Sequence, residues 1–193
     1  GDLGTAIILV AIVLGTLFFA GVRLRVLAIP AFVMAVAAIA LSFSGGSRQE
    51  RILAWQSGCT SDVDYNGLCW QPLHGWWALA SGGIFGVGLG NSKAKWSWLP
   101  EADNDFIFAI IGEELGLIGA IVVLALFVVL AFSFIRIIRG SSDPAARITV
   151  SAVLTWIVVQ AFVNIAVVLG LLPVLGVPLP LISAGGSSLV TTL

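Results

Sequence analysis

The stretch FIFAIIGEELGLIGAIVVLALFVVLAFSFI, residues 106–135, decides the fold of this chain. Only Glu113 and Glu114 place charge in a run that is otherwise apolar or small. An α-helix needs about 20 such residues to cross the hydrocarbon core of a bilayer, and this run is longer than that. We therefore predict a membrane-spanning helix here.

The composition of the whole chain also indicates a membrane protein. Of its 193 residues, 59% are hydrophobic and 10% are charged, whereas soluble domains carry about 25% charged residues. Further apolar runs predict spans at residues 3–22, 26–43, 148–172 and 181–193. No run alternates as β-strands do, so we predict an all-α, polytopic bundle with about five spans. Because both ends of the chain fall in or beside a span, we expect it to be part of a longer protein.

The arginines predict how this bundle lies in the membrane. Two short loops between spans carry arginine, at Arg23, Arg25, Arg136, Arg139 and Arg147. Short basic loops are typical of the cytoplasmic side. We therefore expect residues 44–104 and 170–180 on the outer side. The net charge of −1 and the lack of basic tracts do not suggest a nucleic-acid partner.

The two cysteines, Cys59 and Cys69, lie in the predicted outer loop, 44–104, on either side of a polar turn. An oxidising exterior favours a disulfide that closes this turn, and two free thiols are the alternative. Nothing nearby indicates a redox site.

Tryptophan is concentrated in the same loop, at Trp55, Trp70, Trp76, Trp77, Trp96 and Trp98. Because an indole ring favours the headgroup level, we expect the loop to lie against the membrane, with short interfacial helices at residues 51–55 and 71–80. The alternative is that these rings only anchor the neighbouring spans.

A glycine-rich segment, SGGIFGVGLGNSKAKW, occupies residues 81–96. Backbone N–H groups of such a turn, together with Lys93 and Lys95, can bind phosphate. The alternative is a flexible turn whose lysines meet lipid headgroups, because no strand precedes the glycines as in a nucleotide-binding fold.

Five acids surround the start of the central run. Asp105 directly precedes it and is suited to cap the helix, but Asp103 and Asn104 could cap it equally well, so capping does not require all three acids at 101–105. Glu113 and Glu114 lie about 12 Å further along a helix. Acids inside a membrane either hydrogen-bond to structure or act chemically. Gly112 and Gly116 flank this pair, which favours close helix approach.

The second polar element is GLLPVLGVPLPLISAGGSS, residues 170–188. Its prolines and glycines exclude a regular span, and such backbone is tolerated where it lines a cavity or is buried. Its hydroxyls and accessible N–H groups lie at Ser183, Gly185, Gly186, Ser187 and Ser188. We expect this segment to meet the outer loop at one site. His74 is the only histidine, so a zinc site is not expected.

Five motifs in order carry a resemblance to a known family: DLGTA (2–6), SGGIFGVGLGNSKAKW (81–96), WLPEADNDFIFAIIGEELG (98–116), QAFVNIAVVLGLLP (160–173) and PLPLISAGGSS (178–188). Together they resemble the SEDS family of membrane glycosyltransferases, which build the bacterial cell wall, and cover nearly the whole chain. The resemblance is strongest to the division branch, with the elongation branch as the alternative. It implies that the chain is the C-terminal half of a ten-span protein.

The resemblance also implies an activity, which is polymerisation of lipid II into peptidoglycan strands at the outer face of the bacterial cytoplasmic membrane, at the division septum. The essential acid of the family corresponds to Asp105, which would accept or orient the proton of the attacking hydroxyl. One carboxylate suffices because pyrophosphate is a good leaving group, and a single displacement would invert the sugar carbon. Asp103 stands where the family usually has histidine. It either discourages ionisation of Asp105 or helps to hold a cation.

The remaining site residues follow from the same resemblance. Lys93 and Lys95 would neutralise pyrophosphate. Glu101 would tune the neighbouring Asp105 or coordinate a cation. Substrate contacts are expected from Ser183, Gly185, Gly186 and Ser187. No cofactor is required, although a divalent cation such as Mg or Mn remains open. A class B penicillin-binding protein and other division proteins are the expected partners.

Two readings of another class compete with the polymerase. A lipid flippase or transporter would place its essential acids deep in the bundle, around Glu113 and Glu114. A scaffold that recruits the transpeptidase would need none of the acids.

Overall fold

The computed structural model describes residues 3–43, 46–59, 67–96 and 99–184. Every regular element in these ranges is helical, which confirms the all-α prediction. The helices are α1 Leu3–Phe19, α2 Leu24–Phe43, α3 Gly46–Gln56, α5 Trp70–Gly82, the short 3-10 helix η1 Ala94–Trp96, α6 Ile107–Gly140 and α7 Pro144–Val168. Most of the predicted span 181–193 lies outside the described residues.

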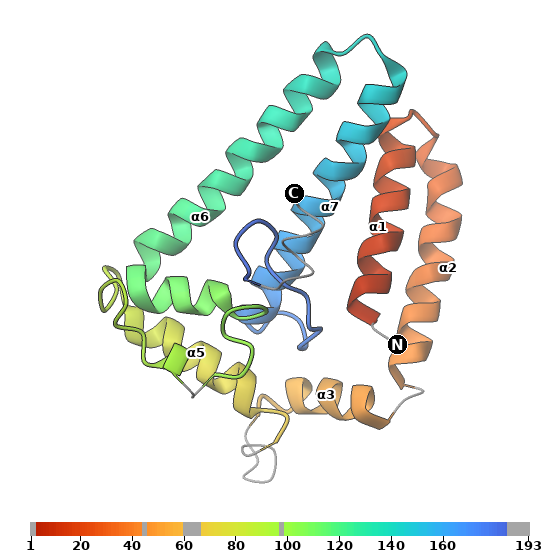
Figure 1. Cartoon of the computed structure of the whole chain (residues 1–193). Coiled ribbons are helices and arrows are strands. Elements are labelled where there is room, and N and C mark those ends of the chain that lie inside the picture. The colour runs from red at the N-terminus through yellow and green to blue at the C-terminus, as the bar shows by residue number, and fades with distance from the viewer. Residues whose placement is uncertain (1–2, 44–45, 60–66, 97–98, 185–193) are drawn as a thin grey trace.

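The apolar runs form the long helices of the bundle (Figure 1). Helices α6 and α7 are long and apolar enough to cross a membrane, while Gly4–Phe19 and Leu24–Ala37 are shorter apolar helices. Helix α7 contacts α1 and α6, and α2 pairs with α1. The contact between α1 and α7 is close, because a Cβ atom on Gly15 would lie 2.4 Å from Thr155 Cγ2.

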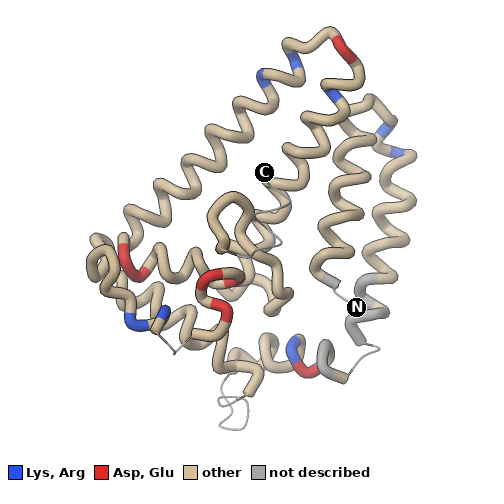
Figure 2. Tube along the Cα trace, viewed as in Figure 1, with Lys and Arg blue, Asp and Glu red and all other residues tan. Residues whose placement is uncertain are grey.

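Charge divides the bundle into two ends. Figure 2 shows the arginines of the α1–α2 and α6–α7 turns at one end of the long helices. The acids of residues 101–105 and 113–114 lie toward the other end, where α3 and α5 cross the bundle (Figures 1 and 2). The two arginine-bearing turns therefore share a side, as the sequence predicts.

The helix predicted from the central apolar run is broken. Gly116 has φ 68° and ψ −164°, so α6 consists of one segment at 107–115 and another at 117–140, which run in different directions (Figure 1). A Cβ atom on Gly116 would lie 2.4 Å from Gly86 N and 2.5 Å from Ile84 O. The apolar run predicted to span at 106–135 is therefore helical but bent at Gly116, because the glycine-rich segment occupies the inside of the bend.

Helix α7 begins and ends earlier than predicted. Its N-cap is Asp143, whose carboxylate accepts hydrogen bonds from Ala145 N (3.0 Å) and Ala146 N (3.3 Å). Pro144 at the first helical position suits this start. The helix ends at Val168, before Gly170, which has φ +77° and packs against the Trp76 ring.

The predicted outer loop contains two helices at the expected places. Helices α3 and α5 include the predicted segments 51–55 and 71–80. A disulfide joins Cys59 and Cys69, which lie after α3 and directly before α5. Helix α5 packs on the first segment of α6, where Gly82 lies so near Gly112 that a Cβ atom on Gly82 would meet its carbonyl oxygen. The close approach expected around Gly112 is thus present.

Candidate functional site

The acidic loop folds around the backbone of Glu101. This residue has φ 54°, and its carbonyl oxygen accepts hydrogen bonds from the N–H groups of residues 104, 105 and 106 at 3.1–3.3 Å. Its carboxylate also accepts from Asn104 Nδ2 at 2.7 Å. The N-cap of α6 is Phe106, one residue after the predicted cap Asp105. Glu101 therefore shapes the turn that presents Asp105.

Asn164 connects Asp105 to the second polar loop. Its Nδ2 donates to Asp105 O and to Val177 O, each at 2.7 Å, and the residue is only 1% exposed. One turn earlier on the same face of α7, Gln160 Nε2 donates to Pro178 O at 2.9 Å. The two amides thus anchor the proline-rich loop on α7, and one of them also holds the backbone of Asp105.

The loops at 101–105 and 170–184 meet, as predicted. Gly176 lies beside the Asp105 side chain, since a Cβ atom on this glycine would be 3.6 Å from Asp105 Oδ2. Ala184 N donates to Asp103 O at 3.0 Å. Ser183 is buried and its hydroxyl donates to Asn104 O (2.6 Å) while accepting from the Leu179 N–H (2.7 Å). Ser183 therefore ties the two loops together. The other predicted contacts, Gly185, Gly186 and Ser187, lie outside the described residues.

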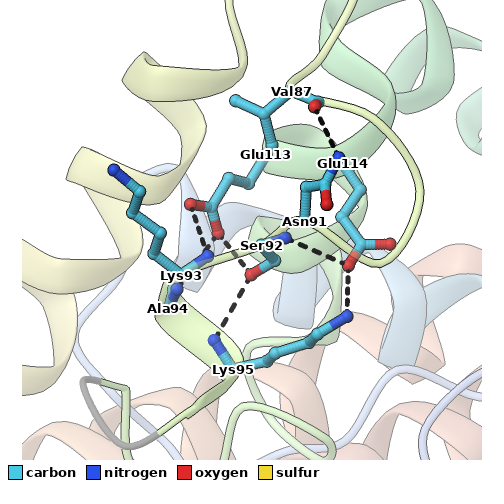
Figure 3. A network of polar contacts seen from close by, with 8 residues as sticks. All are labelled: Val87, Asn91, Ser92, Lys93, Ala94, Lys95, Glu113 and Glu114. Atoms are coloured by element: carbon cyan, nitrogen blue, oxygen red, sulfur yellow. Dashed lines mark hydrogen bonds and ion pairs between the residues drawn. The ribbon is translucent and has the colours of Figure 1, made fainter.

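Glu113 is surrounded by the glycine-rich segment (Figure 3). It is 4% exposed, and its carboxylate accepts from Ser92 Oγ (2.5 Å), Lys93 N (3.1 Å) and Ala94 N (3.3 Å). A longer contact from Ser81 Oγ measures 3.4 Å. The N–H groups predicted to bind phosphate at this point are therefore directed at an anion of the protein itself.

Glu114 pairs with one of the two lysines. Lys95 Nζ lies 2.7 Å from Glu114 Oε1, and Ser92 N donates to the same oxygen at 3.4 Å. The Lys93 side chain is exposed and extends away from both carboxylates in Figure 3. The backbone carbonyls of Glu113 and Glu114 accept from Val87 N and Gly88 N. The two glutamates thus fasten the segment to α6, which is the structural alternative considered for them.

The acid and the lysines occupy different ends of one short helix. Asp105 precedes the segment 107–115, and Glu113 and Glu114 end it, about 12 Å away along the axis. Lys95 is directed to Glu114. Among the described residues, no three His, Cys, Asp or Glu side chains form a metal-binding group.

Sequence reasoning missed the function of Asn164. The signal was present, because two amides four residues apart on an apolar helix share a face and need hydrogen-bonding partners. Their partners could not be identified, since the loop residues that they bind lie 13 and 18 positions later in the sequence.

Known proteins are similar to this chain over its whole length. The family profile FTSW_RODA_SPOVE, described as "Cell cycle protein", matches residues 1–193. The chain belongs to this family. It is 47% identical over 192 residues to a Mycobacterium tuberculosis relative named "Probable peptidoglycan glycosyltransferase FtsW", covering 100% of the chain and 36% of the relative.

Other members of the FtsW/RodA/SpoVE family are similar over the whole chain. The Geobacter metallireducens protein of the same name is 39% identical over 198 residues, covering 50% of that relative. The "Stage V sporulation protein E" of Bacillus subtilis is 37% identical over 192 residues, covering 52% of it. The chain thus spans about half or less of the length of these relatives.

The fold is also found in a solved structure of a peptidoglycan synthase complex. One of its chains matches with a TM-score of 0.73 at 24% identity, and the match covers 100% of this chain and 52% of that one. The resemblance to the SEDS family is therefore confirmed at the level of family and fold.

Proposed function

We propose that the full-length protein is a peptidoglycan glycosyltransferase that polymerises lipid II, with Asp105 as the catalytic base. The observation that carries this proposal is the placement of Asp105. Its backbone is held by Asn164, its side chain lies beside Gly176, and it stands where two irregular loops meet. The relatives named as peptidoglycan glycosyltransferases support the reaction class.

The reaction proceeds as a single displacement. The 4-hydroxyl oxygen of the acceptor sugar forms a bond to C1 of the donor sugar, and the bond from C1 to the pyrophosphate oxygen breaks. Undecaprenyl pyrophosphate leaves with the bonding electrons, the hydroxyl proton passes to Asp105, and C1 is inverted. A positioned base contributes about 10²–10⁴-fold to such a step.

The same proposal includes location and partners. The arginine-bearing end faces the cytoplasm, and the end with Asp105 faces outside, where lipid II would be used at the division septum. A class B penicillin-binding protein is the proposed partner, which the likeness to a chain of a peptidoglycan synthase complex supports. The named FtsW relatives favour division over RodA-type elongation.

The flippase alternative has less support. It requires Glu113 and Glu114 to line a path, but their carboxylates are bonded to the glycine-rich segment and to Lys95.

For the polymerase, Lys93 is a better candidate than Lys95 for a pyrophosphate contact, because the Lys93 side chain is exposed and Lys95 is paired with Glu114.

The test is lipid II polymerisation by the full-length protein with its transpeptidase partner. Asp105→Asn keeps the size of the side chain and removes the base, so glycan synthesis should fall by at least about 100-fold. Asp143→Asn is the matched control, because asparagine also caps a helix and this residue lies at the arginine end. If Asp105→Asn made glycan at the wild-type rate, Asp105 would not be the catalytic base. Lipid transport without polymer would favour the flippase.

A further inference from the structure

A pocket of about 320 Å³ lies between α3, α5 and the loop that follows α7. Its volume is at the lower end of the range for small-molecule sites, about 300–1,000 Å³. It therefore suits a compact unit rather than an extended chain. The residues that decide its chemistry are Arg51, Trp55, Trp70, Gln71 and Trp76.

Aromatic rings form walls of this pocket, and one of them is fixed in orientation. Trp55 Nε1 donates to Gly170 O at 2.8 Å, which ties α3 to the loop after α7. Trp76 packs against the same glycine from α5. The Cys59–Cys69 disulfide links the end of α3 to the start of α5, and Cys59 itself lines the pocket. Trp55 is thus held in place before any ligand arrives.

The charged side chain of the pocket is a hydrogen-bond donor. Arg51 lines the pocket, and no carboxylate is among its described lining residues. A guanidinium presents five N–H donors and no acceptor, so an occupant that supplies acceptor oxygens is favoured.

Residues from both loops that meet at Asp105 line the pocket. Pro100, whose carbonyl accepts from Gln71 Nε2 at 3.0 Å, lines it and begins the acidic turn. Val174 lines it from the other loop, two residues before Gly176, which lies beside Asp105. A ligand held here would lie against the two loops that meet at the proposed reaction centre.

We propose that this pocket is a saccharide subsite that holds one N-acetylated sugar unit of the glycan. A pyranose ring has an apolar face that stacks on indole, and its hydroxyl and acetamido oxygens accept from Arg51. The choice of a sugar over a lipid headgroup rests on the proposed polymerase function, because both ligands offer oxygen acceptors.

The probe is chitotetraose, a soluble tetramer of N-acetylglucosamine, and binding to the full-length protein in detergent is measured by saturation-transfer NMR. Arg51→Gln and Trp76→Phe should each weaken binding by about tenfold, since the first removes the guanidinium and the second replaces an indole with a smaller stacking ring. Arg147→Gln, an exposed arginine at the opposite end, is the matched control and should bind as the wild type does.

Asp105→Asn separates this proposal from the polymerase. It should retain chitotetraose binding within about twofold while losing polymerisation, because Asp105 does not line the pocket. Binding that depends on Arg51 and Trp76 would support the subsite even if the wild type made no polymer. The proposal is overturned if the wild type shows no saturable binding, or if Arg51→Gln and Trp76→Phe both bind normally. It is also overturned if glycerol phosphate, and not the sugar, occupies the pocket.

Discussion

Replacing Asn164 by leucine should uncouple Asp105 from the rest of the site. The substitution keeps a side chain of similar volume and removes both hydrogen bonds of Nδ2, to Asp105 O and to Val177 O. A buried carbonyl left without its donor costs about 1–3 kcal/mol, so two such groups set a limit of about 2–6 kcal/mol. Because Asn164 Oδ1 is itself buried without a partner among the described residues, its removal recovers part of this cost. We expect a net destabilisation of about 2–4 kcal/mol.

The rate of polymerisation should fall by more than the loss of folding stability alone would cause. Misplacing a catalytic group by about 1 Å can reduce a rate by about 100-fold, and Asn164 tethers the Asp105 backbone to α7. Gln160→Leu is the matched control, because it removes the bond to Pro178 O and the bond from Trp156 Nε1 without touching Asp105. It should lower the melting temperature, with a smaller loss of polymerisation.

The assay compares initial rates of lipid II polymerisation with melting temperatures of the full-length protein, both in the same detergent. The reasoning would be refuted if Asn164→Leu, still folded at the assay temperature, polymerised at the wild-type rate. It would also be refuted if Gln160→Leu lost as much activity for the same loss of stability.

Three other substitutions test the architecture. Gly116→Ala should destabilise the full-length protein by at least about 2 kcal/mol in thermal unfolding, because φ is 68° and the new Cβ meets backbone atoms at 2.4–2.5 Å; an unchanged melting temperature would contradict the bend. In a double-mutant cycle with alanine, Lys95 and Glu114 should show a coupling of about 1 kcal/mol, as expected of a partly buried pair, and additivity would argue against the ion pair. Reducing the bond between Cys59 and Cys69 opens a loop with a sequence separation of 10 and should cost about 2–3 kcal/mol; a melting temperature insensitive to reductant, in a protein whose thiols are shown to be free, would disprove it.

The apolar helices could be predicted from the sequence, but the break in α6 could not. Apolar length alone predicts the helices, and the arginines predict which turns share an end. Glycine at position 116 permits a bend, but an unbroken helix is equally compatible with the pattern GEELG. The bend depends on residues 84–86, which enter from a segment about 30 positions earlier. Periodicity within a window cannot report such a contact.

The candidate site could be predicted only in part, because some of its contacts also join segments that are distant in the sequence. The acidic turn and the proline-rich loop each signal irregular backbone, so their meeting could be expected. The partners of Glu113 and Lys95 could not, since charge and glycine content describe a phosphate cradle and a carboxylate cradle equally well. Which anion fills it is decided by the packing of α5 against α6, where Gly82 brings the glycine-rich segment onto Gly112.

The cradle around Glu113 has a consequence for how freely its sequence can change. At position 93 the carboxylate uses only the main-chain N–H, and the lysine side chain extends into the open. Nearly any residue can therefore occupy that position without loosening the anchor, and proline alone is barred because it has no N–H. Substitutions at position 93 can therefore change the surface charge without changing the fold.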